Sequence, residues 1–383
     1  MVIGNLVPML AGNRGAPAAN PEQERLMAAQ AGLVVHEAEP LNCETPPSAL
    51  GSDVTPTARF YRRNHFPIPV LDEAPWRLGV SGMVDRPLSL SLYELTQLPA
   101  ETMVVTLECA GNGRAQFRLP TPGVQWGVGA VGTAEWTGPR LADVLERTGI
   151  RRGAREVIFA GADRGSVDDS RRPIRFERSL TVADALESGA LLAYAMNGQP
   201  LPARHGYPVR LVVPGWYAVA SVKWLTDIRV VEEPFEGFFQ AVHYVYERNR
   251  GGTAAAEPVR LQQVRTLITR PGSGEQLACG GLIVRGVAWS GAAPIERVEV
   301  SVAGGPWRKA RLVAAAATHG WQQWEFLATD LGPGEASIRA RATDLAGQVQ
   351  PEQPEQPEQP EQPEWNRLGY GANFIHEVRV LLR

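Results

Sequence analysis

The chain has 383 residues and a formal net charge of −3 at neutral pH, with 44% hydrophobic and 21% charged residues. This length favours two domains, and the composition is typical of a globular protein with enough apolar residues for extensive cores. The slightly negative charge argues against a nucleic-acid-binding surface, although a local basic pocket is compatible with it. No apolar run approaches about 18 residues, so we expect no membrane span.

Residues 1–55 are rich in proline, alanine and polar side chains, and we expect an extended arm with one short helix from Pro21 to about Ala31. The N-terminus has neither a basic n-region nor a twin arginine. This pattern favours a cytoplasmic protein, or a periplasmic one whose signal peptide has been trimmed.

Residues 56–254 alternate between strand-like and helix-like patterns, which predicts a mixed α/β domain. The strand-like runs are 77–84, 103–110, 155–162, 208–215 and 222–231, and the helical patterns are 91–98, 140–149 and 181–198. The pattern changes near residue 255, where we place the domain boundary.

Residues 255–383 consist of short alternating runs separated by turn residues at intervals of roughly ten residues, which predicts an all-β sandwich. The runs are 265–269, 282–291, 295–305, 307–313, 321–329, 335–344 and 374–382. The fold class we expect is therefore α+β. Within the sandwich, a Pro-Glu-Gln repeat at 351–364 predicts a surface loop of polyproline character, with protein docking as an alternative role.

The three cysteines are Cys43, Cys109 and Cys279, which are too few and too scattered for a disulfide framework. Two inert buried thiols are favoured over a Cys43–Cys279 bridge. The chain has no Cys-X-X-Cys motif, and its six histidines lack the His-Glu-X-X-His spacing. A metal centre built from protein ligands alone is therefore not expected.

Cys109 stands out because it ends the apolar run VVTLE and precedes Ala-Gly-Asn-Gly-Arg, so a strand presents it at a tight turn. A buried structural thiol and a nucleophile activated by a distant base are two possible roles. The third is a soft ligand to a metal that a cofactor otherwise holds, since that role needs only one protein sulfur.

Polar and basic residues recur at the predicted strand ends, and together with Cys109 they would form a pocket for an anionic cofactor tail. The residues concerned are Arg63, Asn64, His65, Asp163, His205, Arg210 and Lys223.

Long blocks of the chain from about Leu41 to Arg383 resemble the sulfite oxidase family of molybdopterin enzymes. The blocks that carry the resemblance are FYRRNHFPIP, TLECAGNGR, GVQWGVGAVGTAEWTG, LLAYAMNGQPLPARHGYPVRLVVPGWYAVASVKWL and WNRLGYGANFIHEVRV. Their number and order make the resemblance specific.

The resemblance implies a molybdenum–molybdopterin cofactor whose metal binds the Cys109 thiolate. It implies pterin contacts from Tyr61, Arg63, Asn64, His65, Asp163, His205, Arg210, Ser221, Val222 and Lys223. The substrate pocket would use Arg63, Arg114, Trp126 and Tyr244, although the two aromatic residues could instead be plain core residues. His243 is next to Tyr244 in the sequence and could support this tyrosine without contacting the substrate. An immunoglobulin-like C-terminal domain would mediate a homodimer.

The implied activity is the oxidation of sulfite to sulfate. Vertebrate members carry a haem domain, whereas this chain has none, so electrons would pass to an external acceptor such as a cytochrome c. In animal members an arginine directly precedes the glycine of the closing WN..G motif. Here Leu368 holds that position and Arg367 comes one residue earlier. We therefore expect weaker sulfite binding.

Three alternatives stay open at this point. The first is a reductive enzyme of the same fold, acting on nitrate or a sulfoxide. The second is an enzyme acting on a carrier-bound sulfur species, and the third is a non-catalytic subunit. Arg114 favours sulfite over nitrate, and retention of Cys109 with the basic residues argues against a non-catalytic role.

Overall fold

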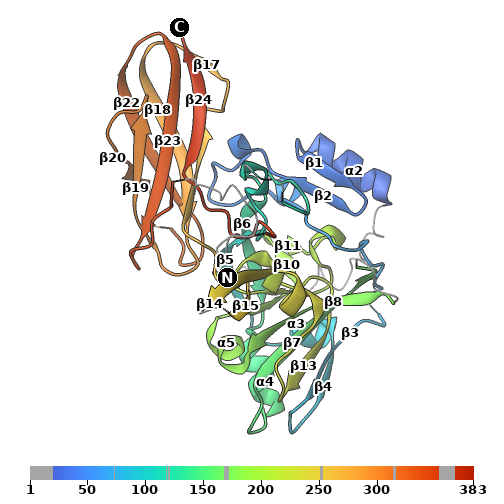
Figure 1. The fold of residues 1–383 in the computed structure, drawn as a ribbon. Coiled ribbons are helices and arrows are strands. Elements are labelled where there is room, and N and C mark those ends of the chain that lie inside the picture. Colours follow the sequence, from blue (N-terminus) through green and yellow to red (C-terminus); the bar gives the residue numbers. More distant parts are fainter. Residues whose placement is uncertain are drawn as a thin grey trace.

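The computed structural model of the chain describes residues 20–72, 74–117, 119, 121–167, 172–250, 253–313, 316–352 and 367–383. A mixed α/β domain occupies the lower part of Figure 1, and an all-β domain stands beside it. The predicted Pro-Glu-Gln loop at 351–364 lies outside the described residues, apart from its first two positions.

The N-terminal segment is more ordered than the extended arm predicted from its composition. The expected helix is present as α2 (Pro21–Gln30), which Asn20 and Gln23 cap reciprocally. A hairpin of β1 (Val34–Ala38) and β2 (Leu41–Glu44) follows, and it was not predicted. Every residue of β2 is buried, because this strand lies against the mixed domain.

A five-stranded sheet forms one layer of the mixed domain, in the order β4-β3-β13-β7-β8. Only the β3–β13 pair is parallel within this sheet. Helices α3 (Leu92–Thr96) and α4 (Leu141–Thr148) contribute apolar residues to the same core. The strands are β3 (Arg77–Gly82), β4 (Leu88–Ser91), β7 (Glu156–Gly165), β8 (Ile174–Thr181) and β13 (Leu225–Val231).

A second sheet of the mixed domain has the order β11-β10-β6-β5, and β9 pairs with β12 beside it. Its long strand pair, β5 with β6, is antiparallel over its whole length. The strands are β5 (Glu101–Glu108), β6 (Val131–Gly138), β9 (Leu191–Ala193), β10 (Ala195–Met196), β11 (Gln199–Pro200) and β12 (Arg210–Val212).

The helix predicted over 181–198 is wrong in its second half. Helix α5 covers only Val182–Glu187, and Gly189 then adopts a φ of +69°, which ends the helix. The apolar residues that follow form β9 and β10, all of them buried. Burial in a sheet therefore overrides the helical pattern of this segment.

The C-terminal domain is the predicted sandwich of two sheets, with strand orders β16-β18-β22-β21 and β17-β24-β23-β19-β20. A turn follows β19, with positive φ at Ala303 and Gly304. The strands are β16 (Arg265–Arg270), β17 (Gln276–Leu277), β18 (Gly280–Trp289), β19 (Ile295–Val302), β20 (Arg308–Lys309), β21 (Arg311–Leu312), β22 (Gln322–Leu331), β23 (Gly334–Asp344) and β24 (His376–Leu382).

A hairpin of β14 (Val245–Arg250) and β15 (Thr253–Pro258) lies between the two domains in sequence, and the predicted boundary near residue 255 falls within β15. Short helical turns complete the described elements: η2 (Pro47–Ala49), η3 (Thr57–Arg59), η4 (Arg114–Gln116), η5 (Ala203–His205), η6 (Ala218–Ala220) and η7 (Phe238–Val242).

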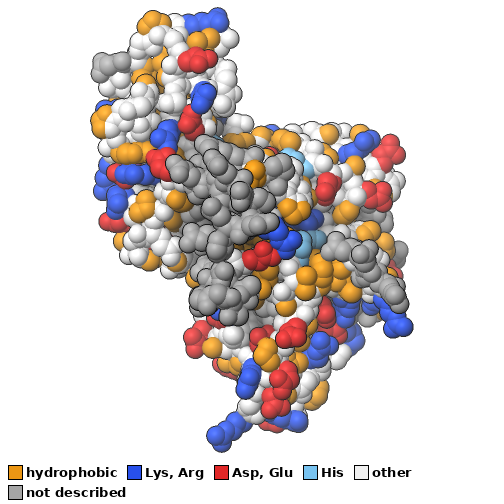
Figure 2. Space-filling model, viewed as in Figure 1, with side chains coloured by type: hydrophobic (Ala, Val, Ile, Leu, Met, Phe, Trp, Pro, Cys, Tyr) orange, Lys and Arg blue, Asp and Glu red, His pale blue; other side chains and the backbone are white. Residues whose placement is uncertain are grey.

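Acidic and basic side chains are interspersed on the face shown in Figure 2. Among the described helices, none has the length and apolar character needed to cross a bilayer.

Candidate functional site

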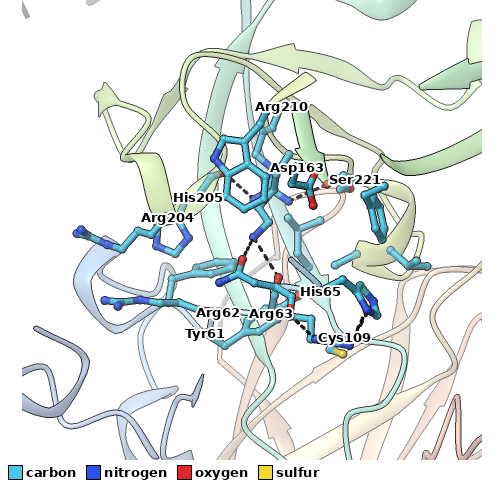
Figure 3. Close-up of a pocket in the computed structure, with 18 of the residues that line it drawn as sticks. Tyr61, Arg62, Arg63, His65, Cys109, Asp163, Arg204, His205, Arg210 and Ser221 are labelled. Atoms are coloured by element: carbon cyan, nitrogen blue, oxygen red, sulfur yellow. Dashed lines mark hydrogen bonds between the residues drawn. The ribbon is translucent and has the colours of Figure 1, made fainter. Parts of the chain in front are cut away.

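A pocket opens in the mixed domain where the loops after β2, β5 and η5 meet the segment around η6 (Figure 3). It encloses about 710 Å³ of space free of protein atoms, counting the part open to solvent. The lining includes eleven residues that the sequence analysis selected: Tyr61, Arg63, Asn64, His65, Cys109, Asp163, His205, Arg210, Ser221, Lys223 and Tyr244.

Cys109 lies directly after β5, at the start of the predicted turn. Its N–H donates to the carbonyl of Ala130 at 2.8 Å, and its own carbonyl accepts from the N–H of Asn112 at 2.9 Å. The thiol is free, and Figure 3 shows its sulfur within the group of pocket residues. Burial raises the pKa of the Cys109 thiol, and the guanidinium of Arg63 opposes this shift. The pocket is therefore lined by a buried free thiol that is close to a cation.

The other two cysteines are also free, and they lie in different surroundings. Cys43 is buried in β2, whereas Cys279 is exposed in the C-terminal domain. No disulfide joins them, so the preference for two free thiols over a bridge is confirmed. The expectation that both are buried is wrong for Cys279, which lies in the turn between β17 and β18.

Arg63, His65 and Tyr244 form one wall of the pocket. Nη2 of Arg63 lies 3.0 Å from Nδ1 of His65, and Nε2 of His65 lies 2.7 Å from the Tyr244 hydroxyl. Burial, followed by the charge of Arg63, holds the pKa of His65 well below its usual range. The imidazole is therefore neutral near pH 7. Nη2 of Arg63 also lies 3.2 Å from Nε2 of His65, so this guanidinium is within donating distance of both ring nitrogens.

Tyr244 has a φ of +59°, a left-handed conformation that costs free energy in any residue other than glycine. Its ring stacks on that of Tyr370, with ring centroids 4.7 Å apart. The hydroxyl is within hydrogen-bonding distance of His65, and Tyr244 lines the pocket. Strained backbone at a pocket wall is typical of a functional residue.

Basic side chains gather at the end of the pocket away from Cys109. Burial lowers the pKa of Lys223 to about 7 and that of Arg210 to about 10. Lys223 Nζ donates to the Arg63 carbonyl at 3.0 Å. Arg210 donates to the carbonyls of His205 and Ser221, at 3.1 and 3.0 Å. These cations are desolvated without a matching number of carboxylates, so an anion would be stabilised here.

Asp163 lies in the same region and has a polar atom without a partner. Its Oδ1 is buried and accepts no hydrogen bond, and burial raises the pKa of this carboxyl to about 6. Nε of Arg210 is likewise buried without an acceptor. Because buried polar atoms are normally paired, these atoms fit a polar ligand with both N–H groups and an anionic end.

The donor chemistry of the pocket fits a metal that is held mainly by such a ligand. No group of three or more His, Cys, Asp or Glu side chains that could hold a metal ion occurs in the described part of the chain. A single thiolate is a suitable ligand for a soft metal centre whose other ligands come from an organic cofactor. The residues present therefore fit a metal–pterin group of the kind that the family resemblance implies.

Three of the predicted residues do not line the pocket. Val222 is buried between pocket residues, and its carbonyl accepts from the N–H of Leu211. Trp126 is fully buried in the apolar cluster that also contains Cys109 and Tyr61. Arg114 lies behind the Cys109 turn, where it donates to backbone carbonyls.

Sequence reasoning missed Arg62 and Arg204, which also line the pocket. Their side chains extend away from Cys109 (Figure 3) and meet the carboxylate of Glu24 in α2, at 2.9 and 3.9 Å. The doubled arginine in FYRRNHF was the only available signal. Glu24 thus joins the two segments that carry most of the predicted cofactor contacts.

Two family models match the chain. The oxidoreductase molybdopterin binding domain matches residues 65–239, and the Mo-co oxidoreductase dimerisation domain matches residues 259–382. The first range contains the Cys109 turn and most of the pocket, and the second covers the sandwich.

Similar proteins come from animals, plants and bacteria. Mitochondrial sulfite oxidase of Macaca fascicularis is 35% identical over 374 residues, which cover 91% of this chain and 66% of that protein. Sulfite oxidase of Arabidopsis thaliana is 34% identical over 378 residues, covering 92% and 94%. The crystal structure of the sulfane dehydrogenase SoxCD from Paracoccus pantotrophus superposes with a TM-score of 0.75 at 27% identity, covering 88% and 83%.

The chain thus spans slightly less than two thirds of the macaque protein and nearly all of the plant protein. Its fold matches SoxCD across both domains. The chain therefore belongs to the sulfite oxidase family of molybdopterin-dependent oxidoreductases.

Proposed function

We propose that the protein oxidises sulfite to sulfate at a molybdenum–pterin centre in this pocket. The observation that carries the proposal is that one pocket is lined by the Cys109 thiol and by the buried cations Arg210 and Lys223. The overall reaction converts sulfite and water into sulfate, two protons and two electrons. An external acceptor, such as a cytochrome c, takes the electrons.

The pocket residues divide into a metal end and an anion end. Cys109 provides the thiolate ligand, and the charges of Arg63 and Arg114 favour its ionised form. Arg210 and Lys223 would bind the phosphate of the pterin, and Asp163 would accept hydrogen bonds from its N–H groups. The neutral imidazole of His205 lies beside them, with its Nε2 3.1 Å from the carbonyl of Thr57. Tyr61, Asn64, His65 and Ser221 would complete the contacts. When bound, this group supplies the oxygen-atom transfer and takes up two electrons.

The substrate is a small dianion near neutral pH, so its site must be cationic and partly dry. Arg63 supplies a permanent charge at the pocket wall, and Arg114 adds a second charge from behind the turn. Tyr244 donates its hydroxyl hydrogen to an oxyanion. Trp126, in the apolar cluster beneath Cys109, keeps water from the metal end.

Two partners belong to this proposal. One is a second copy of the chain, bound through the C-terminal domain, since that domain matches a model named for dimerisation. The other is the electron acceptor. Light scattering of the purified protein tests the first, because a dimer has twice the mass of the chain.

Activity and metal content test the proposed reaction together. We expect molybdenum near one atom per chain and sulfite-dependent reduction of ferricyanide or cytochrome c by the purified protein. Nitrate-dependent oxidation of a reduced dye is expected to be negligible. A protein that contains molybdenum but turns over nitrate in preference to sulfite would contradict the proposal.

A second candidate is the oxidation of a sulfane sulfur, which the similarity to the sulfane dehydrogenase SoxCD favours. The same pocket would then receive a persulfide in place of sulfite. A comparison of kcat/KM for sulfite with that for a small-molecule persulfide separates the two candidates. A higher value for the persulfide would make sulfane oxidation the function.

A further inference from the structure

We infer that the C-terminal domain completes the active site, with Arg265 acting as a positioning residue that fixes the turn bearing Cys109. The inference rests on the proposed function, because that function gives Cys109 its role as metal ligand. It extends the role of this domain beyond the dimerisation for which its family model is named.

A buried ion pair joins the two domains directly beside Cys109. Glu108 is the last residue of β5, and Arg265 is the first residue of β16 in the sandwich. Nη1 of Arg265 lies 2.9 Å from Oε1 of Glu108, and both side chains are 2% exposed or less. Trp289 of β18 donates its indole N–H to Oε2 at 2.9 Å. The sandwich therefore supplies two donors to the carboxylate that precedes the thiol.

The same guanidinium also binds the turn itself. Nη1 of Arg265 lies 3.0 Å from the carbonyl of Asn112 and 2.6 Å from that of Ala372. The Asn112 side chain donates to Glu108 at 2.9 Å and accepts from the N–H of Ala130 at 3.1 Å. Arg265 thus lies between the turn and the C-terminal segment of the chain.

The turn is shaped to receive this side chain. Gly113 has a φ of +87°, and a Cβ at that position would lie 2.8 Å from Nη2 of Arg265. The N–H of Gly371 donates to the carbonyl of Ala110 at 2.7 Å. A shift of the turn would therefore break hydrogen bonds to several segments of the sandwich at once.

Positioning explains this arrangement better than stability does. The desolvation of two buried charges offsets most of their attraction, so a buried ion pair contributes little net stability. The directional hydrogen bonds of a guanidinium, in contrast, fix the geometry of what they bind. Because Cys109 follows Glu108 directly, the pair determines where the sulfur stands in the pocket.

Thiol labelling of the full-length apoprotein tests the inference without using enzyme activity. All variants are made in a Cys279→Ser background, which removes the exposed thiol. Iodoacetamide labelling of Cys109 and Cys43 is followed by peptide mass spectrometry, and the buried Cys43 reports global opening. The variants are Arg265→Met, Glu108→Gln and the double variant, with Arg311→Met as a control because that arginine pairs with Glu325 at the surface.

We expect labelling of Cys109 to accelerate on the order of tenfold in Arg265→Met, because the turn opens locally. Labelling of Cys43 should stay unchanged, and Arg311→Met should match the background. The double variant should be slower to label than Arg265→Met, since the neutral amide introduced by Glu108→Gln leaves no unpaired buried charge. If Arg265→Met does not fold, Glu108→Gln decides, with faster Cys109 labelling expected.

An unchanged Cys109 rate, or equal acceleration of Cys109 and Cys43, would overturn the inference. Failure of the proposed function is a separate outcome, since it would appear as missing molybdenum or missing sulfite turnover in the unsubstituted protein. A holoenzyme measurement adds to the test: Arg265→Met should lower kcat while the KM for sulfite is retained.

Discussion

The guanidinium of Arg114 donates to the carbonyl oxygen of Leu368 from both Nε and Nη2, at 3.3 and 3.1 Å. A third donor, Nη1, binds the carbonyl of Val124 at 2.9 Å. Arg114 thereby binds the closing segment of the chain to the loop beside Cys109. Arg367 points elsewhere, because both its Nε and its Nη2 bind the carboxylate of Glu247.

Replacing Arg114 should weaken sulfite binding. We expect Arg114→Gln to raise the KM for sulfite about tenfold, or about 1.4 kcal/mol, because it removes a positive charge that acts on the pocket from behind the turn. Steady-state kinetics with sulfite and ferricyanide provide the measurement. Arg367→Ala is the matched control, with an unchanged KM expected, since Arg367 is 64% exposed and pairs with Glu247. An equal effect of the two substitutions would refute the assignment of Arg114.

Replacing the proposed metal ligand should abolish turnover while leaving the fold intact. A serine hydroxyl at position 109 is hard and poorly ionised, which makes it a weak ligand for a soft metal centre. We expect Cys109→Ser to show no sulfite oxidation above background, with a thermal midpoint close to that of the unsubstituted protein. Cys279→Ser, an exposed change in the sandwich, should retain full activity.

Loss of the Glu24 carboxylate should open the pocket wall and lower stability. Glu24 lies 2.9 Å from the Arg62 guanidinium, and their side chains are only 6% and 2% exposed. Removing one partner of a buried pair costs about 3–5 kcal/mol. We expect Glu24→Ala to show this loss of stability in urea unfolding of the apoprotein. In the cofactor-loaded protein, the same substitution should speed the release of the bound pterin. Glu22→Ala, an exposed change in the same helix turn, should have little effect.

Lys223 and Asp163 should contribute opposite pH dependences to the stability of the apoprotein. Burial lowers the pKa of Lys223 from 10.5 to about 7. Between about pH 7 and pH 10.5, Lys223 is therefore protonated in the unfolded chain and neutral in the folded one. Its contribution to the free energy of unfolding rises with pH over this range. Burial raises the pKa of Asp163 from 3.8 to about 6, so stability falls as pH rises over that range.

Urea unfolding of the apoprotein across pH 4–10 measures how the free energy of unfolding depends on pH. This range covers the changed pKa values of Asp163 and Lys223. Lys223→Met should remove the rise above pH 7, because it removes the group that titrates there. A slope that persists in this variant would assign the titration to another residue.

The elements nearest the pocket were predictable because local signals agreed. The β-branched run before Cys109 and the glycines after it predict a strand and a turn, and both are present. The segment after Gly189 was wrongly predicted as helix, since a short apolar run fits a helix and a buried strand equally well. Its pairing with β12 decided between them, and that contact is not visible in the local pattern.

The contacts that hold the site together could not be predicted from local sequence. Glu24 and Arg62 are 38 residues apart, and Glu108 and Arg265 are 157 residues apart. Nothing in the composition of either segment identifies its partner. Most of the pocket residues were selected because they lie at predicted strand ends. The resemblance to the family adds Tyr61, Ser221 and Tyr244, and the geometry adds Arg62 and Arg204.

X-ray absorption at the molybdenum edge tests the central claim most directly, because it counts the sulfur atoms bound to the metal. The purified protein and the Cys109→Ser variant would be compared, each loaded with cofactor. We predict that the variant has one sulfur ligand fewer. An identical sulfur shell in the two proteins would show that Cys109 does not bind the metal.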